Sequence, residues 1–435
     1  MKSARFITAA ALTALLVQAP GVALADETCQ SPYMAKLTGE EEFVYIWTLG
    51  MEGLGDGSDK LVTVDSRKDS PTFGQVIDVD SVGGRHEAHH GGLSDDRKTY
   101  WVSGLDTGHI FLFDIANDPS NPKLVKIITD FTEKSGVVGP HGAYALPGRV
   151  MISGLSNAKD RDGPTGLVEY TNDGEYITTH WMPKGEKIEG VKLDTVADGY
   201  GYDARVLPRK NVMLTSSFTG WNNYMTDLGK VVKDPEAMKK FGQTMVVWDF
   251  HARKPKQVLS VPGVPLEIRW AWGPKNDYAF TTTALTSKLY VIHEDKKKGD
   301  WAATDVADIG DPSKLPLPVD ISLSADDSTL FVNTFMDGTL RVFDVRDPFK
   351  PKQILEKKLG NQVNMVSQSW DGKRFYFTTS LLSKWDKKGK ENDQFLKAFY
   401  WDGKDLKPRF EIDFIKAELG RPHLMRFGSK SLYSN

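Results

Sequence analysis

Cysteine is almost absent from this sequence, since Cys29 is the only one among 435 residues. No disulfide can form within one chain, so the fold must be held together by its core. Cys29 stands near the N-terminus, and we interpret it as a free thiol in a tail rather than a catalytic group. A disulfide to another chain is the alternative.

Long apolar runs are also missing, except near the N-terminus. Lys2 and Arg5 precede the apolar run 6–17, and Ala23-Leu24-Ala25 supplies small residues for cleavage. This pattern is typical of a secretory signal peptide over residues 1–25. The run is too short to span a membrane stably. We therefore expect a periplasmic protein that has no membrane span.

Positive charge is not in excess, because the sequence has 55 Lys and Arg residues and 58 Asp and Glu residues, which gives a net charge of −3. Removal of the leader takes away Lys2 and Arg5 and leaves the chain more acidic. This balance argues against a nucleic-acid partner. It leaves the oligomeric state open, a homo-oligomer included.

Segments with helical periodicity are scarce as well. Apolar segments are short, rich in Val, Ile, Phe, Tyr and Thr, and separated by frequent Pro and Gly, which is typical of an all-β fold. Polar turns followed by a short strand recur six times, as expected for hairpins. They are residues 94–101, 146–151, 207–213, 273–279, 324–330 and 369–375.

A second marker, a strand that ends in a turn, alternates with the first. Its seven copies are residues 61–65, 110–114, 166–170, 245–249, 288–292, 340–344 and 397–401. Seven units would have about 60 residues each, above the ~40–50 of typical blades, with the excess in loops such as 219–242 and 384–393. We predict one domain over residues 26–435, a seven-bladed β-propeller. Six or eight blades are alternatives, whereas a pair of β-sandwiches would not explain the alternation.

Polar residues recur where the innermost strand of each blade should begin. This strand precedes the first marker, and its start lies near the central channel. The positions counted back from the markers hold His89, His90, His141, Asp203, Glu267, Arg269, Asp320 and Asn364, and His423 precedes the last strand. Histidines at equivalent blade positions predict a metal site in the channel. We expect His109, His180, His251 and His293 on outer strands or turns, and leave His86 unassigned.

Residues 86–90 also fit the metalloprotease pattern H-E-x-x-H. That motif works on a helix, where residues four apart share a face. Gly83-Gly84 and Gly91-Gly92 bracket only six residues, too few for a stable helix. We therefore set the protease interpretation aside.

Imidazole ligands suit copper, zinc, iron and nickel. No cysteine lies near the histidines, which excludes a blue-copper thiolate site. An imidazole cage in an exported protein favours copper, with zinc as the alternative.

Several segments resemble the selenium-binding protein and methanethiol oxidase family, and most of all its exported bacterial methanethiol oxidases. The resemblance covers essentially the whole chain after the leader. It is carried by Ser31-Pro32-Tyr33, Ala88-His89-His90-Gly91-Gly92, Pro140-His141-Gly142, Pro265-Leu266-Glu267-Ile268-Arg269-Trp270, residues 371–380 and Pro422-His423.

The resemblance implies a propeller that oxidises methanethiol with copper. Methanethiol, oxygen and water would become formaldehyde, hydrogen sulfide and hydrogen peroxide. His89, His90, His141 and His423 match the family's histidine positions. Gly74 stands where animal relatives have the cysteine associated with selenium, so selenium binding there is not implied.

Such a reaction needs a base for the methyl carbon, and Glu267 and Asp320 are the candidates. Arg269 could instead pair with one of them. Trp270, Phe335 and Trp370 could form an apolar wall for a small thiol. The alternative is a propeller without enzymatic activity, which binds a metal or a partner protein.

The leader predicts that protein recovered from the cell envelope begins at Asp26. Mass spectrometry of the intact exported chain would show this directly. An exported chain that keeps Met1 would contradict the prediction.

Overall fold

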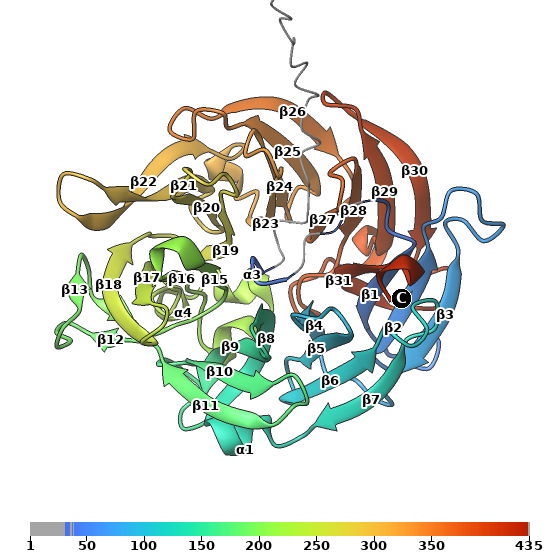
Figure 1. Cartoon of the computed structure of the whole chain (residues 1–435), viewed down its shortest axis with the longest axis horizontal. Helices are drawn as coiled ribbons and strands as arrows, with labels where there is room; N and C mark the ends of the chain where they lie inside the picture. Colours follow the sequence, from blue (N-terminus) through green and yellow to red (C-terminus); the bar gives the residue numbers. More distant parts are fainter. Residues whose placement is uncertain (1–30, 35–36, 38, 434–435) are drawn as a thin grey trace, which may run out of the picture.

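The computed structural model describes residues 31–34, 37 and 39–433. Seven sheets of four or five strands stand radially around a central axis (Figure 1). The predicted seven-bladed β-propeller is confirmed, and six blades, eight blades and paired sandwiches are excluded. The expected leader and Cys29 lie outside the described residues. No helix in the described part of the chain is long and apolar enough to span a membrane.

We number the blades in chain order and give each from its innermost strand outward. Blade 1 contains β31 (Arg421–Gly428), β1 (Phe43–Leu49), β2 (Lys60–Asp65) and β3 (Val76–Ser81). Blade 2 contains β4 (Ala88–Leu93), β5 (Thr99–Gly104), β6 (His109–Asp114) and β7 (Lys123–Ile128). Blade 3 contains β8 (Val137–Leu146), β9 (Arg149–Asn157), β10 (Gly166–Thr171) and β11 (Tyr176–Trp181). Blade 4 contains β15 (Ala204–Leu207), β16 (Val212–Thr215), β17 (Thr244–Asp249), β18 (Lys254–Ser260) and β13 (Lys192–Leu193).

The last three blades have four strands each. Blade 5 contains β19 (Pro265–Trp270), β20 (Tyr278–Thr283), β21 (Lys288–Asp295) and β22 (Asp300–Asp308). Blade 6 contains β23 (Pro318–Leu323), β24 (Thr329–Thr334), β25 (Thr339–Asp344) and β26 (Lys352–Lys358). Blade 7 contains β27 (Val366–Gln368), β28 (Arg374–Thr378), β29 (Phe395–Trp401) and β30 (Leu406–Asp413).

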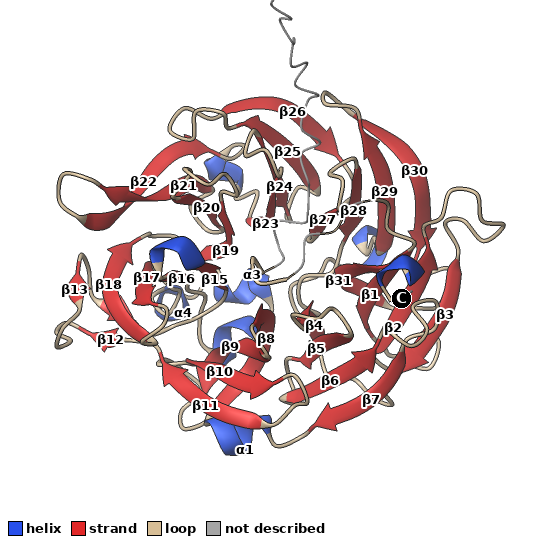
Figure 2. Cartoon of the chain, viewed as in Figure 1, coloured by secondary structure: helices blue, strands red, loops and turns tan. Residues whose placement is uncertain are grey.

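Short elements decorate the ring (Figure 2). β12 (Lys184–Gly185) pairs with β14 (Ala197–Asp198), and α1 (Phe131–Ser135) precedes blade 3. The connection from β16 to β17 carries α2 (Trp221–Tyr224), α3 (Leu228–Val231) and α4 (Pro235–Met238). We call this segment, residues 216–243, the blade-4 insertion. Figure 1 shows its helix α3 at the centre of the ring.

Burial falls from the axis outward. Every residue of β4, β19 and β23 is buried, whereas the outermost strand β7 alternates between exposed and half-buried positions until its last residue, Ile128, which is buried. Inner strands are covered on both faces by neighbouring blades, so their sequences need not alternate apolar with polar residues. Polar side chains on these strands are therefore buried and need partners within the protein, as where Gln368 of β27 donates to Ser322 of β23 at 2.9 Å.

The two sequence markers correspond to fixed parts of a blade. The six turns join an inner strand to the second strand, and the seven strand segments are the third strands. Blade 1 has no turn of the first kind, because its inner strand β31 is the last strand in sequence and its second strand β1 is the first. Antiparallel pairing of Phe43 with Gly428 through Leu49 with Arg421 closes the ring.

A buried ion pair fastens blade 1 to blade 7. The Arg374 guanidinium donates two hydrogen bonds to the Glu41 carboxylate, at 2.7 and 2.8 Å. The Tyr376 hydroxyl also donates to Glu41. Glu41 and Arg374 are 0% and 1% exposed, so neither charge can be solvated by water if the other is removed.

We expect Glu41→Ala to lower the free energy of unfolding by about 1.5–3 kcal/mol, because it removes charge-assisted hydrogen bonds from the buried Arg374 and leaves that guanidinium paired, among the described residues, only with Asp371 and Glu40, at 3.1 and 3.2 Å. Urea titration followed by tryptophan fluorescence would measure the change. Glu411→Ala is the matched control, since Glu411 is 56% exposed in its pair with Lys397 and should change stability by less than about 0.5 kcal/mol. Equal effects of the two substitutions would contradict this interpretation.

Candidate metal centre

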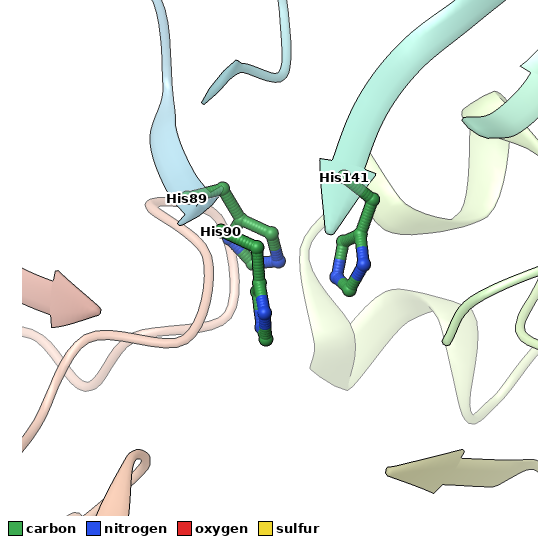
Figure 3. A group of neighbouring side chains, drawn as sticks. All are labelled: His89, His90 and His141. Carbon is green, nitrogen blue, oxygen red and sulfur yellow. The ribbon is translucent and has the colours of Figure 1, made fainter. Parts of the chain in front are cut away.

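Three inner strands bring the four predicted histidines together in the channel. His89 and His90 come from β4, His141 from β8 and His423 from β31, and all four are buried. Figure 3 shows His89, His90 and His141 facing one another. One ring nitrogen from each of these three lies within 4.8 Å of the others, close enough for one metal ion.

His423 completes the group from the last strand. Its ring centroid lies 4.0 Å from that of His89 and 5.0 Å from that of His90. The structure therefore brings the four predicted histidines close together, and three of them, His89, His90 and His141, form the group whose ring nitrogens lie within 4.8 Å of one another.

A β-bulge lies at each histidine position. The pairing register shifts between Ala88 and Gly91 in β4, between Pro140 and Ala143 in β8, and opposite His423 in β31. In a regular strand His89 and His90 would point to opposite faces of the sheet. A bulge changes the direction of a side chain, and here both rings reach the same site.

The glycine pair after the histidines permits close packing of two blades. A Cβ on Gly91 would lie 2.3 Å from the Trp101 carbonyl oxygen, and one on Gly92 would lie 2.0 Å from that of Ala143. Any larger residue would push β4 away from β5 and β8. Gly91 and Gly92 thus position His89 and His90.

Hydrogen bonds to main-chain carbonyls define which histidine nitrogens have a lone pair free to bind a metal. His141 Nδ1 lies 3.1 Å from the Tyr202 oxygen, and His423 Nδ1 lies 2.7 Å from the Ser380 oxygen. A carbonyl only accepts, so each Nδ1 carries the proton and each Nε2 keeps its lone pair. Within the described residues, both Nε2 atoms and His89 Nδ1 are buried without a hydrogen-bond partner. A bound metal would satisfy all three nitrogens, and the carbonyls would orient the rings.

Burial keeps these rings neutral. It lowers the pKa of His89 and His90 well below the ordinary value, and lowers the pKa of His141 and His423 to about 3. Neutral imidazole is the form that binds metals. The donor set therefore fits a metal such as copper or zinc.

The two predicted carboxylates differ in their surroundings. Glu267 Oε1 lies 3.9 Å from His90 Nε2, while Oε2 accepts a hydrogen bond from Arg269 at 2.8 Å. Asp320 accepts from Arg269 at 2.9 Å and from the backbone N–H groups of Ile321 and Val366, both at 2.8 Å. Both of its oxygens are thus engaged. Burial raises the pKa of Asp320 to about 7, although Arg269 acts in the opposite direction.

A narrow apolar cavity adjoins the histidines on the side of the blade-4 insertion. His89 contributes to its wall, and the Tyr202 ring, also in the wall, lies 4.1 Å from the His141 ring. Phe218, Leu381 and Trp385 continue the wall.

The predicted apolar wall is largely wrong. Trp270 faces a different cavity, and Trp370 packs in the core of blades 1 and 7, whereas Phe335 packs in the cluster that surrounds the cavity. Tyr202 and Phe218 were not predicted from the sequence, because they lie outside the strands. Tyr202 directly precedes Asp203, a predicted channel residue, and this position could have indicated that Tyr202 lies near the channel.

The remaining histidines lie away from the centre, as expected. His109, His180 and His293 lie on β6, β11 and β21, and His251 is in an exposed turn. His86 packs against His109 and bonds to Thr107. His89 and His90 lie on a strand, so the structure does not support the helical protease motif.

Fold and site together define a β-propeller with a buried imidazole cluster suited to a metal. Residues 23–429 match the family described as 56kDa selenium binding protein, and the chain belongs to this family. It is 61% identical over 430 residues to a methanethiol oxidase of Ruegeria pomeroyi, covering 98% of both chains. It is 56% identical over 432 residues to a methanethiol oxidase of a Hyphomicrobium species, covering 99% of this chain and 97% of that one.

A solved structure shares the fold. The X-ray structure of a hypothetical selenium-binding protein from Sulfolobus tokodaii superposes with a TM-score of 0.77 at 22% identity, covering 92% of this chain and 96% of that one. At this identity the likeness supports the fold alone.

We expect His141→Ala and His423→Ala each to lose most of the bound metal, because each removes a buried nitrogen lone pair from the cluster. His251→Ala should keep the full metal content, since His251 is exposed in a turn. Elemental analysis of purified, folded variants, with electron paramagnetic resonance for copper, would test this. A merely supporting residue would cost about 10–100-fold in affinity, so titration separates ligands from supporting residues. Full metal in both channel variants would overturn the assignment.

Proposed function

We propose that the protein is a copper-dependent methanethiol oxidase, exported to the periplasm by its leader. The observation that carries the proposal is a buried imidazole cluster with three unsatisfied nitrogens beside an apolar cavity. Two relatives of more than half identity over nearly the full length, both methanethiol oxidases, support it. Methanethiol, oxygen and water would yield formaldehyde, hydrogen sulfide and hydrogen peroxide.

The four histidines would hold the copper. When bound, copper would supply a Lewis acid that lowers the pKa of a thiol, together with a redox couple for oxygen. The carbonyls of Tyr202 and Ser380 fix the rings of His141 and His423, so the ligand lone pairs are oriented before metal binds. The apolar side chains beside His89 limit the access of water to the cluster.

Glu267 is the better placed of the two candidate bases. Its Oε1 faces His90, and Arg269 holds its Oε2, so the carboxylate is oriented toward the cluster. Asp320 instead joins three blades, because Arg269 of blade 5 and the Val366 N–H of blade 7 both donate to it. We therefore assign proton acceptance to Glu267 and a structural role to Asp320.

Purified copper-loaded protein should consume oxygen when methanethiol is added, and an oxygen electrode with formaldehyde and peroxide assays would measure this. Metal binding without any turnover would favour a propeller that only stores metal. Glu267→Gln should lower kcat by about 10²–10⁴-fold with unchanged copper, because the amide cannot accept the proton.

Asp320→Asn is the matched comparison. It should lower the unfolding temperature while the folded fraction keeps most of its kcat, because the amide disturbs the bonds from Arg269 and Val366. If folded Asp320→Asn loses kcat while Glu267→Gln keeps a normal kcat, Asp320 is the proton acceptor and Glu267 has the structural role.

A further inference from the structure

One loop contacts two of the four channel histidines, and we propose that Asp386 and Glu87 are the positioning residues that hold this loop in place. The loop follows β28 and spans residues 380–386, and we call it the blade-7 loop. Its backbone bonds to His89 and His423, so its position decides which ring nitrogens these two histidines present to a metal. The role concerns the metal centre itself, whichever reaction that centre catalyses.

Neighbouring carbonyl groups of the blade-7 loop orient the two rings. The Ser380 carbonyl accepts a hydrogen bond from His423 Nδ1 at 2.7 Å. The Leu381 backbone bonds to the His89 ring, and because the Leu381 N–H donates to Asp386, the group that meets His89 is the carbonyl. His89 Nδ1 has no hydrogen-bond partner in the part of the chain that the structure describes, so Nε2 makes this bond. A carbonyl only accepts, and the loop therefore leaves a lone pair on His423 Nε2 and on His89 Nδ1.

Asp386 holds the first half of the blade-7 loop. Its buried carboxylate accepts hydrogen bonds from the Leu381 N–H and the Ser380 hydroxyl, both at 2.8 Å. Arg421, which lies two residues before His423 on β31, donates to the same carboxylate at 3.1 Å. Asp386 thus fixes both residues whose carbonyls meet the histidines, and it ties them to the strand that carries His423.

Glu87 ties the middle of the blade-7 loop to the start of β4. Its buried carboxylate accepts hydrogen bonds from the Ser383 N–H and the Ser383 hydroxyl, both at 2.6 Å. Glu87 has a φ of 58°, which is uncommon for a residue other than glycine. Backbone strain of this kind persists only where neighbouring contacts impose it, and it clusters at functional sites. Here the bonds to Ser383 impose it directly before Ala88 and His89, so the loop and β4 position each other.

Both carboxylates act on the histidines through the loop, so their removal should change the rings before any metal binds. Long-range proton–nitrogen NMR spectra of histidine-labelled, metal-free protein report which ring nitrogen carries the proton. Wild type should show the proton on Nδ1 of His423 and on Nε2 of His89. Asp386→Ala and Glu87→Ala should each give a mixture of the two forms at His89. The change at His423 should be smaller, because Asn364 also donates to its carbonyl partner, at 2.5 Å.

Copper titration gives a second readout. Each variant should bind copper about 10–100-fold more weakly, the usual cost of losing a residue that orients a ligand, and its electron paramagnetic resonance signal should change. Asp327→Ala is the matched control, because Asp327 is as buried as Asp386 and accepts three hydrogen bonds, each at 2.7 Å, from the first turn of blade 5. It should lower stability but keep the wild-type tautomers and copper affinity.

Where an alanine variant does not fold, Asp386→Asn or Glu87→Gln replaces it and should give a smaller effect in the same direction. Unchanged tautomers in the folded variants, or a copper affinity within about twofold of wild type, would overturn the assignment. An equal loss in Asp327→Ala would overturn it as well, because the effect would then come from lost stability. If the wild-type protein binds no copper, the proposed function fails, while the tautomers of the metal-free protein still decide the roles of Asp386 and Glu87.

Discussion

Pairing between the last strand and the first is the contact on which the site depends. β31 forms hydrogen bonds with β1, and this closure places the His423 ring 4.0 Å from the His89 ring. No local segment could bring these residues together, because almost the whole propeller separates them in sequence. The Arg374–Glu41 pair fixes the same closure from blade 7.

Buried carboxylates also join neighbouring blades to each other. Asp203 accepts the Ile268 N–H of the next blade at 3.0 Å, Asp320 accepts that of Val366 at 2.8 Å, and Asp59 accepts that of Ala88 at 2.9 Å. In each case a buried carboxylate satisfies a backbone donor of the next blade's inner strand, at its first residue for Val366 and Ala88 and within the strand for Ile268. In β4 the residue held in this way, Ala88, directly precedes the bulge that directs His89 and His90 to one point.

The sequence predicted much of this arrangement, because turns and inner-strand polar residues have direct physical signatures. Strands buried on both faces tolerate a histidine only where its polar atoms find partners. The presence of His141 and His423 on such strands therefore indicated a site in the channel. The bulges could not be predicted, because they depend on the register with neighbouring strands. The cavity wall was predicted poorly, because Phe218 and Trp385 come from loops that have no periodic pattern. The roles of Glu267 and Asp320 became distinguishable only when their partners, Arg269 and Val366, were known.

The unsatisfied nitrogens of the histidine cluster also affect folding. Two of the strands that carry these histidines are β31, which forms the seam with β1 inside blade 1, and β4, the inner strand of blade 2. A metal bound there would stabilise the closed ring, because the binding site exists only in the closed ring and not in the opened one. By mass action, free metal at 100 times its dissociation constant adds about 2.7 kcal/mol to the stability of the closed ring. Metal binding and closure of the ring would therefore be thermodynamically linked.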